Sequence, residues 1–222
     1  MLERVLEPEV MDTPDEATDY DSMDHSAVNR RFAADFLALA AADTGLTLDV
    51  GTGTAQIPIE LCRQSPDIEI VAVDLADEML KLARRNVERA GFADRIRIEK
   101  VNGRRMDYPP GHFAAVVSNS IIHHIPQPAE CFAEMLRVCA DGGRLFVRDL
   151  HRPVGEAELR NLVETYAGDA NPHQRQLFTA SLRAALTLDE VRTLVGNLGF
   201  VPDSVSLTSD RHWTWSATKA SP

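Results

Sequence analysis

The stretch that most constrains the fold lies at residues 48–56 and reads LDVGTGTAQ. A short apolar run ends in an acidic residue, two glycines follow one residue apart, and a helical pattern then begins at Ile57. This order indicates a strand, a tight turn and a helix, because glycine adopts positive φ angles and allows a ligand close to the backbone. Exposed N–H groups at the start of the helix favour an electronegative ligand group. The stretch therefore predicts a ligand site between a strand and a helix.

The overall composition limits the classes of partner. The chain has 222 residues, of which 44% are hydrophobic, enough for one sizeable core and a single α/β domain with additions. A formal net charge of −11 disfavours a broad phosphate-binding surface, so we expect no nucleic-acid partner. No apolar run approaches the roughly 18–20 residues that span a bilayer, and the acidic N-terminus lacks the apolar core of a signal peptide. We therefore expect a cytoplasmic monomer or homodimer without a membrane span.

The three cysteines lack the CxxC spacing of a zinc site or a redox pair. Cys62 and Cys139 lie in apolar patterns, which favours buried free thiols. We therefore expect no metal site from the cysteines, and no metal cofactor.

Short apolar runs alternate with helical patterns along most of the chain. The expected strands cover 46–50, 68–73, 96–101, 113–118 and 144–149, and the expected helices about 26–41, 55–64, 77–90 and 128–139. This rhythm predicts an α/β fold with a parallel sheet and helices on both faces. Ligands of such sheets lie outside the carboxyl ends of the strands. One edge should therefore gather the residues that follow the strands, namely Gly51, Asp74, Asn102 and Asn119.

Two segments stand outside this alternation. Residues 1–25 are an acidic arm that is either disordered or folded over a ligand as a lid, and residues 26–222 form the main domain. Residues 151–186 break the rhythm after the fifth strand, and we interpret them as a helical cap inserted into the domain. The remaining expected elements are helices over about 156–167, 173–186 and 188–198 and strands over about 203–208 and 212–218.

Four motifs together resemble the class I S-adenosylmethionine-dependent methyltransferases. Residues 49–54 (DVGTGT) resemble the first motif of that family, and Asp74 matches the acidic residue that ends its second strand. Residues 113–124 resemble the fourth-strand motif of its small-molecule methyltransferases. Asp141-Gly142-Gly143 matches the turn that usually reads Pro-Gly-Gly.

This resemblance covers about residues 28–150 and 187–219. It is nearest to the menaquinone and ubiquinone methyltransferase-like group, whose N-terminal Tyr-Asp resembles Tyr20-Asp21. The family fold is a Rossmann-like, doubly wound, mostly parallel seven-stranded sheet with an antiparallel last strand, and we expect that fold here.

The resemblance implies S-adenosylmethionine as the cofactor. Asp49 would accept a hydrogen bond from the ammonium group, and Asp74 would accept charge-assisted hydrogen bonds from the two ribose hydroxyls. Asn102 stands where the family usually has an aspartate that binds the adenine amino group. The full set of implied cofactor-binding residues is Tyr20, Asp49, Gly51, Thr52, Gly53, Asp74, Leu75, Asn102, Gly103 and Asn119.

Two positions depart from the family pattern, and local alternatives stay open. Ala55 replaces a third glycine, and Asn102 replaces an aspartate, although its amide oxygen can accept the same bond. The glycines can also form a plain turn, Asp74 can cap a helix, and Asn119 can turn the backbone locally. Gln56 occupies the place of the last glycine of a dinucleotide fingerprint, so the pattern disfavours a dehydrogenase.

The family chemistry is methyl transfer by direct displacement, in which the protein mainly aligns donor and acceptor. A base is needed only when the acceptor loses a proton, and His123 and His124 are the candidates because they follow the fourth strand. Adjacent side chains in an extended segment diverge, so we expect only one, preferably His124, to face the pocket. Their spacing is also wrong for a paired metal site on a helix.

The cap is of modest size, which suits a small-molecule acceptor. His151 is a candidate for the pocket wall, and Arg152 for binding an acidic group of the acceptor. Further candidate wall residues are Tyr166, His173, Gln174, Arg175, Phe178 and Ser181. The alternative function is an S-adenosylmethionine-binding protein of the same fold with a non-methylating or regulatory role.

Overall fold

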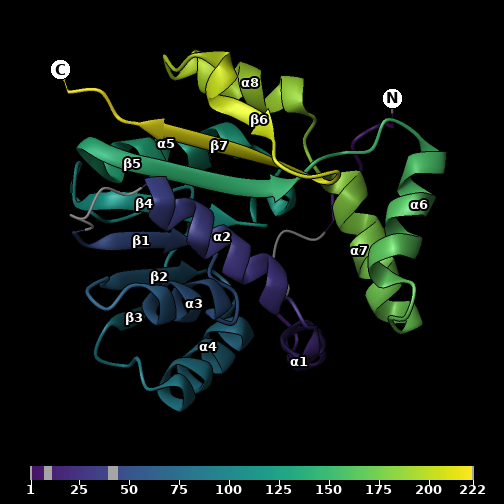
Figure 1. Cartoon of the computed structure of the whole chain (residues 1–222), viewed down its shortest axis with the longest axis horizontal. Coiled ribbons are helices and arrows are strands. Elements are labelled where there is room, and N and C mark those ends of the chain that lie inside the picture. The colour runs from purple at the N-terminus through teal and green to yellow at the C-terminus, as the bar shows by residue number, and fades with distance from the viewer. Residues whose placement is uncertain (1, 8–11, 40–44, 222) are drawn as a thin grey trace.

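A seven-stranded sheet forms the centre of the protein (Figure 1), as seen in a computed structural model that describes residues 2–7, 12–39 and 45–221. The strand order is β3-β2-β1-β4-β5-β7-β6. Neighbours among β1–β5 pair in parallel, and β7 runs antiparallel between β5 and β6, which confirms the predicted sheet. The strands are β1 (Thr47–Val50), β2 (Ile70–Asp74), β3 (Ile96–Lys100), β4 (Phe113–Asn119), β5 (Cys139–Leu150), β6 (Val205–Leu207) and β7 (His212–Thr218).

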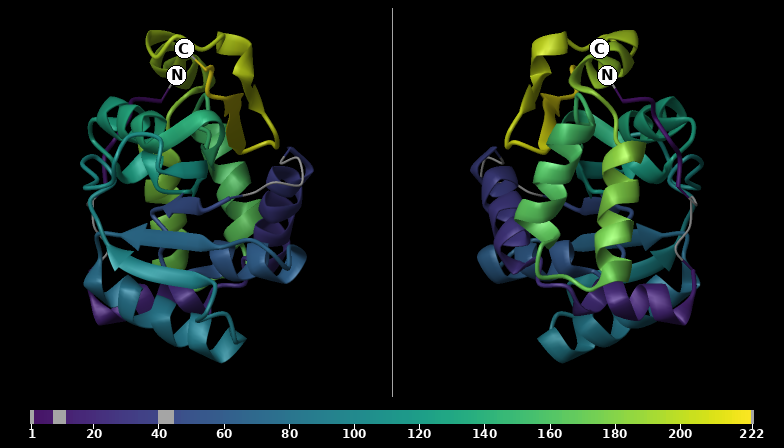
Figure 2. Two further views of the ribbon diagram at one scale, coloured as in Figure 1. Left: turned by 90° about the vertical axis from the view of Figure 1, so that its left-hand side faces the viewer. Right: turned by 90° about the vertical axis from the view of Figure 1, so that its right-hand side faces the viewer.

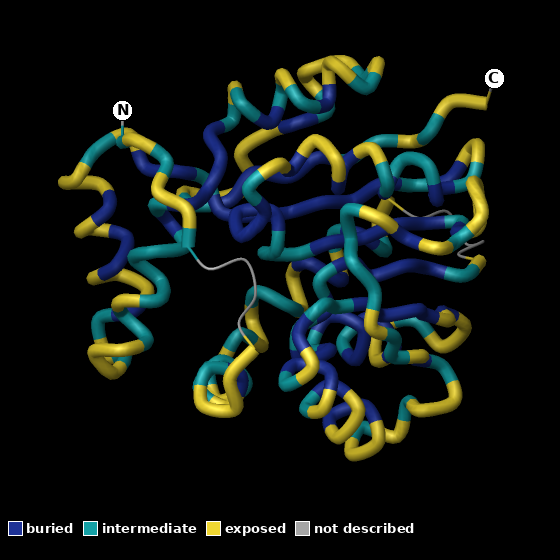
Figure 3. The backbone as a smooth tube through the Cα atoms, turned by 180° about the vertical axis from the view of Figure 1, so that it is seen from behind, coloured by how far each residue is buried: buried dark blue, intermediate teal, exposed yellow. Residues whose placement is uncertain are grey.

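Helices cover both faces of this sheet (Figure 2). The central strands are therefore buried on both faces, as the four consecutive buried residues of β1 illustrate. Figure 3 shows the same strands as the most buried part of the backbone. One face carries α2 (Ser26–Leu39), α3 (Gln56–Gln64) and α4 (Asp77–Ala90), and the other carries α5 (Pro128–Val138) and α8 (Leu188–Asn197).

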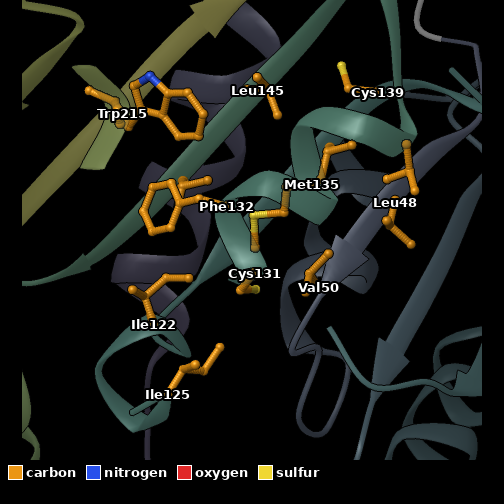
Figure 4. Packing of buried hydrophobic residues seen from close by; sticks show 14 of the residues in the cluster. Leu48, Val50, Ile122, Ile125, Cys131, Phe132, Met135, Cys139, Leu145 and Trp215 are labelled. Carbon is orange, nitrogen blue, oxygen red and sulfur yellow. The ribbon is translucent and has the colours of Figure 1, made fainter. Parts of the chain in front are cut away.

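Each face has its own hydrophobic cluster. Under α2, the Phe32 ring meets the Phe146 ring edge-on, with 5.0 Å between centroids. On the opposite face, Phe132 of α5 packs against Trp215 of β7 at 5.3 Å (Figure 4). These large apolar contacts fix the sheet between its helices and hold its carboxyl edge in place.

The fifth strand begins earlier than its sequence indicates. The predicted range of 144–149 becomes Cys139–Leu150, because Cys139 already pairs with Phe113 of β4. The pairing then shifts to Ala115 with Arg144, so Asp141-Gly142-Gly143 forms an irregularity inside the strand rather than a turn before it. Gly142 has a φ of 75°, a value that glycine adopts without strain.

Part of the acidic arm is a helix that the sequence analysis did not predict. Helix α1 (Pro14–Ser22) begins with a capping box, in which Thr13 and Glu16 exchange hydrogen bonds, and with proline in its first turn. Asp21 ties α1 to the domain by accepting hydrogen bonds from Asn86 Nδ2 at 2.8 Å and Gln56 Nε2 at 3.2 Å. Arm residues 8–11 and the predicted end of α2 at 40–44 lie outside the described residues.

Two helices, α6 (Glu156–Ala167) and α7 (Pro172–Ala184), stand at one end of the molecule (Figure 1). They share a small cluster with Leu150, centred on Leu159, Leu162 and Leu182. The N-terminal segment, residues 2–7, lies against them, and Val5 N donates to the Arg183 carbonyl at 3.2 Å. Within the described residues, no helix combines the length and apolar character that crossing a membrane requires.

Candidate active site

Two adjoining pockets lie outside the carboxyl ends of β1, β2 and β4. Tyr20, Gly51 and Asn119 line both of them. The first pocket is also lined by Gly53, Asp74, Leu75, Asn102, Gly103 and His124. The second is also lined by Asp49, Thr52 and Thr54. The structure therefore brings all ten sequence-predicted cofactor residues to one edge of the sheet, as the ends of parallel strands would do.

The glycine turn after β1 is tight and closely packed. Gly51 has a φ of 74°, and a Cβ there would lie only 2.4 Å from Cγ1 of Ile121. Gly53 has a φ of 53° and donates its N–H to Asp74 Oδ2 at 2.8 Å. Ala55, which replaces the third glycine, also has a left-handed backbone, with a φ of 64°. The backbone thus keeps the conformation of a glycine at a position that carries a methyl group.

Asp74 at the end of β2 links the turn to the next loop. Its Oδ1 accepts from Ala76 N at 3.0 Å while Oδ2 accepts from Gly53 N. The N-cap of α4 is Ala76, and no side chain caps that helix, so Asp74 is not its helix cap. Burial raises the pKa of Asp74. Each carboxylate oxygen retains a lone pair that can accept from a hydroxyl group of a ligand.

The second pocket holds several buried oxygens without partners. Asp49 Oδ2, Thr52 Oγ1, Thr54 Oγ1 and Asn119 Oδ1 make no hydrogen bond within the described part of the chain. Burial raises the pKa of Asp49 to about 7, although the nearby Thr52 hydroxyl opposes this shift, and the charge of Asp74 adds to it. Buried polar atoms normally have partners, so this group fits a ligand that brings donors and a positive charge, such as an ammonium group.

The arm supplies one wall of the site through α1. Tyr20 faces both pockets, and its ring centroid lies 5.4 Å from that of His25. Burial among the carboxylates of Asp74, Asp149 and Asp49 raises the pKa of Tyr20 to about 12, so its hydroxyl stays neutral. A neutral, rigid phenol beside the glycine turn shields that turn from solvent.

The opposite end of the first pocket is mainly apolar. Leu75, Met79, Val101 and Ile125 line it, which suits a flat aromatic ring such as adenine. Asn102 Oδ1 accepts from Arg104 N at 2.9 Å in a local turn, so one of its two acceptor positions is already used.

The two histidines do not diverge as the sequence analysis expected. They lie in a 3₁₀ turn, η1 (Ile122–His124), and their ring centroids are 4.2 Å apart. The rings lie together because the segment is a 3₁₀ turn and not an extended strand. His124 lines the first pocket, whereas His123 is directed to Asp149, with 2.6 Å between Nδ1 and Oδ1. Although burial opposes the charged ring, the Asp149 carboxylate raises the pKa of His123.

The candidate acceptor residues on the cap lie elsewhere. Arg152 is buried and donates to the Ala185 carbonyl at 3.0 Å and to Glu190 Oε1 at 2.6 Å, so its predicted role with an acidic acceptor is wrong. Its guanidinium is used to join the cap to α8. The described residues that line the two pockets do not include the other candidates, His151, Tyr166, His173, Gln174, Arg175, Phe178 and Ser181.

Sequence reasoning missed some residues of this edge. Ser120 follows Asn119 and has a φ of 57°, a conformation that non-glycine residues rarely adopt outside functional sites. Asp149 was seen only as the end of a strand, yet it orients His123 and accepts from Ile122 N and His123 N. Both are polar residues within one position of the carboxyl end of a strand, and this position is the signal that finds them.

Residues 48–147 match the family model of a methyltransferase domain. This match covers 100 of the 222 residues and likens that part of the chain to methyltransferase domains. The chain is 37% identical to the demethylmenaquinone methyltransferase of Deinococcus radiodurans over 107 residues, 48% of this chain and 43% of that protein. It is 33% identical to the ubiquinone/menaquinone biosynthesis C-methyltransferase UbiE of Geobacter sulfurreducens over 110 residues, 49% of this chain and 43% of that protein. The matched part thus spans less than half the length of these two relatives.

Solved structures share the fold of this chain over most of its length. An S-adenosylmethionine-dependent methyltransferase from Aquifex aeolicus superimposes with a TM-score of 0.67 at 15% identity, over 93% of this chain and 98% of that one. The [4+2]-cyclase SpnF superimposes with a TM-score of 0.61 at 16% identity, over 87% of this chain and 82% of that one. At such identities the likeness concerns the fold alone.

Proposed function

We propose that the protein transfers a methyl group from S-adenosylmethionine to a small-molecule acceptor. The observation that carries this proposal is the group of buried, unpartnered oxygens around Asp49, next to the glycine turn. An ammonium group would donate hydrogen bonds to these oxygens. The Asp74 carboxylate, which accepts from Gly53 N of the glycine turn, could also accept from a diol. The apolar end of the pocket suits an adenine ring.

The chain's residues would act mainly by holding and orienting. Asp49, Thr52 and Asn119 would bind the methionine end, and Asp74 the ribose. When bound, the cofactor supplies a methyl group on a positively charged sulfur, which is already activated for displacement. The protein then contributes alignment and exclusion of water, and Tyr20 on α1 is placed to do the latter.

We propose that His124 lies nearest to the acceptor, because it lines the first pocket from the η1 turn. His123 is proposed to act through its contact with His124, held in place by Asp149. The arm 1–25 is proposed as the lid and 151–186 as the cap of domain 26–222. Since η1 and α7 lie in contact, the cap closes the histidine side of the site.

The acceptor is proposed to be a small molecule rather than a nucleic acid, since a net charge of −11 repels phosphates. The relatives named for demethylmenaquinone and ubiquinone/menaquinone methylation make an aromatic or quinone-like acceptor the first class to test. We also propose a cytoplasmic location.

Calorimetric titration with S-adenosylmethionine and S-adenosylhomocysteine tests the cofactor site. The Asp74→Asn variant loses charge-assisted hydrogen bonds worth about 1.5–3 kcal/mol. It should therefore bind S-adenosylmethionine about 10- to 150-fold more weakly. The exposed Asp94→Asn is the matched control and should bind like the wild type. Failure of the wild type to bind either ligand, or unchanged affinity in Asp74→Asn, would contradict the proposal.

Incubation with methyl-labelled cofactor and a metabolite extract tests the transfer itself. Label in a small-molecule product supports methyl transfer. Cofactor binding without any transfer of label would favour the alternative, a non-methylating or regulatory member of the fold.

A further inference from the structure

A cluster of potential metal ligands lies beside the proposed acceptor pocket. Oε1 of Glu7, in the N-terminal segment, is 3.4 Å from His123 Nε2 and 3.4 Å from His124 Nδ1. The three ligand atoms all lie within 4.8 Å of one another. The side chains are nearly inaccessible, with exposed fractions of 8% for Glu7, 4% for His123 and 11% for His124.

Hydrogen bonding alone does not account for this arrangement. A carboxylate placed to bind an imidazolium lies about 2.7–2.9 Å from the ring nitrogen, and both distances here are longer. Glu7 Oε1 is buried and makes no hydrogen bond within the described residues. Ligand atoms on a tetrahedral ion with bonds of about 2.0–2.2 Å are about 3.3–3.6 Å apart, which matches both measured separations.

The surroundings of His123 resemble those of a metal-binding histidine. Its Nδ1 lies 2.6 Å from Oδ1 of Asp149 and donates to this carboxylate, so in the neutral ring the lone pair is on Nε2, the nitrogen that faces Glu7. Asp149 is itself fixed by the backbone N–H groups of Ile122, His123 and Leu150. The ring therefore already has the tautomer and orientation that metal coordination requires.

Arg4 keeps the N-terminal ligand in place. Its guanidinium donates to the carbonyls of Ala184 at 2.7 Å, Ile125 at 3.1 Å and His123 at 3.2 Å. Glu7 Oε2 lies 3.5 Å from Ser181 Oγ of α7. The carboxylates of Glu7 and Asp149 both lie beside the histidines, so a cation bound there would face two negative charges.

We propose that Glu7, His123 and His124 bind a divalent transition-metal ion of the Zn²⁺ type. Two imidazoles and one carboxylate are a ligand set that such ions accept, and three protein ligands leave a coordination position open. Because His124 also lines the pocket, this position suits an oxygen of the acceptor, a consequence that rests on the proposed function. The metal site itself does not depend on methyl transfer.

The sequence spacing of the two histidines does not predict this site. Adjacent histidines are unsuitable for a metal on an α-helix, but the 3₁₀ turn brings the two rings together. The third ligand, Glu7, lies far from the histidines in the sequence, so no local pattern contains the site.

The test uses the full chain after treatment with a chelator and dialysis. Zn²⁺ binding is followed by calorimetry, and Co²⁺ binding by its visible absorption, which reports a low-coordinate nitrogen and oxygen environment. The wild type should bind one equivalent of each ion. Glu7→Gln and His124→Gln should weaken binding at least about 100-fold. Glu3→Gln, an exposed glutamate of the same segment, and His173→Gln, an exposed histidine, should leave binding unchanged.

The proposal is overturned if the wild type binds no stoichiometric ion, or if Glu7→Gln and His124→Gln bind as the wild type does. Circular dichroism of each variant separates loss of the site from loss of the fold, and the two variants provide independent tests. Cofactor affinity, measured on the same samples, reports separately on the proposed function. A chain that binds Zn²⁺ at this site but no S-adenosylmethionine would refute the proposed function and support the metal site.

Discussion

We predict that Asp49 lowers the stability of the ligand-free protein, although it is needed for cofactor binding. Its carboxylate is 1% exposed at the end of β1, and one of its oxygens has no hydrogen-bond partner in the described chain. An ionised carboxylate in this position lacks both water and a compensating donor. We therefore expect Asp49→Asn to stabilise the ligand-free protein at alkaline pH while it removes cofactor binding.

The magnitude follows from the pKa of Asp49, which burial raises from 3.8 to about 7. Between these two values the native state holds a proton that the unfolded chain has released. The free energy of unfolding therefore falls as the pH rises through this window and is constant above it. Since a shift of one pKa unit corresponds to about 1.36 kcal/mol, the free energy of unfolding falls by about 4 kcal/mol in total. Asparagine does not ionise, so the variant avoids this loss.

Urea unfolding of the ligand-free protein at pH 4.5 and pH 8 measures the effect. We expect Asp49→Asn to gain about 2–4 kcal/mol at pH 8 and about 1 kcal/mol at pH 4.5, with a melting temperature about 5–15 °C higher at pH 8. The exposed Asp67→Asn should change stability by less than about 0.5 kcal/mol at either pH. An equal effect of Asp49→Asn at both pH values, or a loss of stability at pH 8, would refute the reasoning.

The remaining predictions concern the backbone of the site and the thiols. Ala55→Gly should leave stability unchanged or raise it by about 1 kcal/mol, because it relieves a φ of 64°, whereas Ala34→Gly in the exposed interior of α2 should cost about 1 kcal/mol in chemical unfolding. Gly51→Ala should cost about 2–4 kcal/mol through its φ of 74° and its contact with Ile121, whereas Gly196→Ala, which has open space, should be neutral or stabilising in the same assay. All three cysteines are buried, and burial raises their pKa values to about 11–12, so a thiol reagent should modify them only after denaturant is added. Rapid labelling of the native protein would contradict this last expectation.

Most of the sheet and its ligand edge could be predicted from local patterns. The runs that became β2 and β4 are short, mostly apolar and closed by a polar residue, and parallel strands bring such ends together. Asp74 and Asn119 were therefore located without any knowledge of their neighbours. Helix α4 was predicted with its observed bounds because Gly91 adopts the left-handed conformation that ends a helix.

Features that depend on contacts between distant segments were not predictable in this way. The position of Glu7 beside the histidines requires the N-terminal segment to lie across the cap, which no local pattern specifies. The role of Arg152 changed because Glu190 lies beside it in the fold. Helix α1 is different, since the capping box of Thr13 and Glu16 was available in the sequence and was overlooked.

The hydrogen bond between Arg4 and Ala184 joins residues 180 positions apart. During synthesis residues 2–7 leave the ribosome long before their partners on α7 are made. Residues 2–7 must therefore wait for α7 before they can dock, and contacts of this length are late to form because their closure entropy is large. The cluster of Glu7, His123 and His124 can therefore be completed only after α7 has been made, although Glu7 is made long before α7.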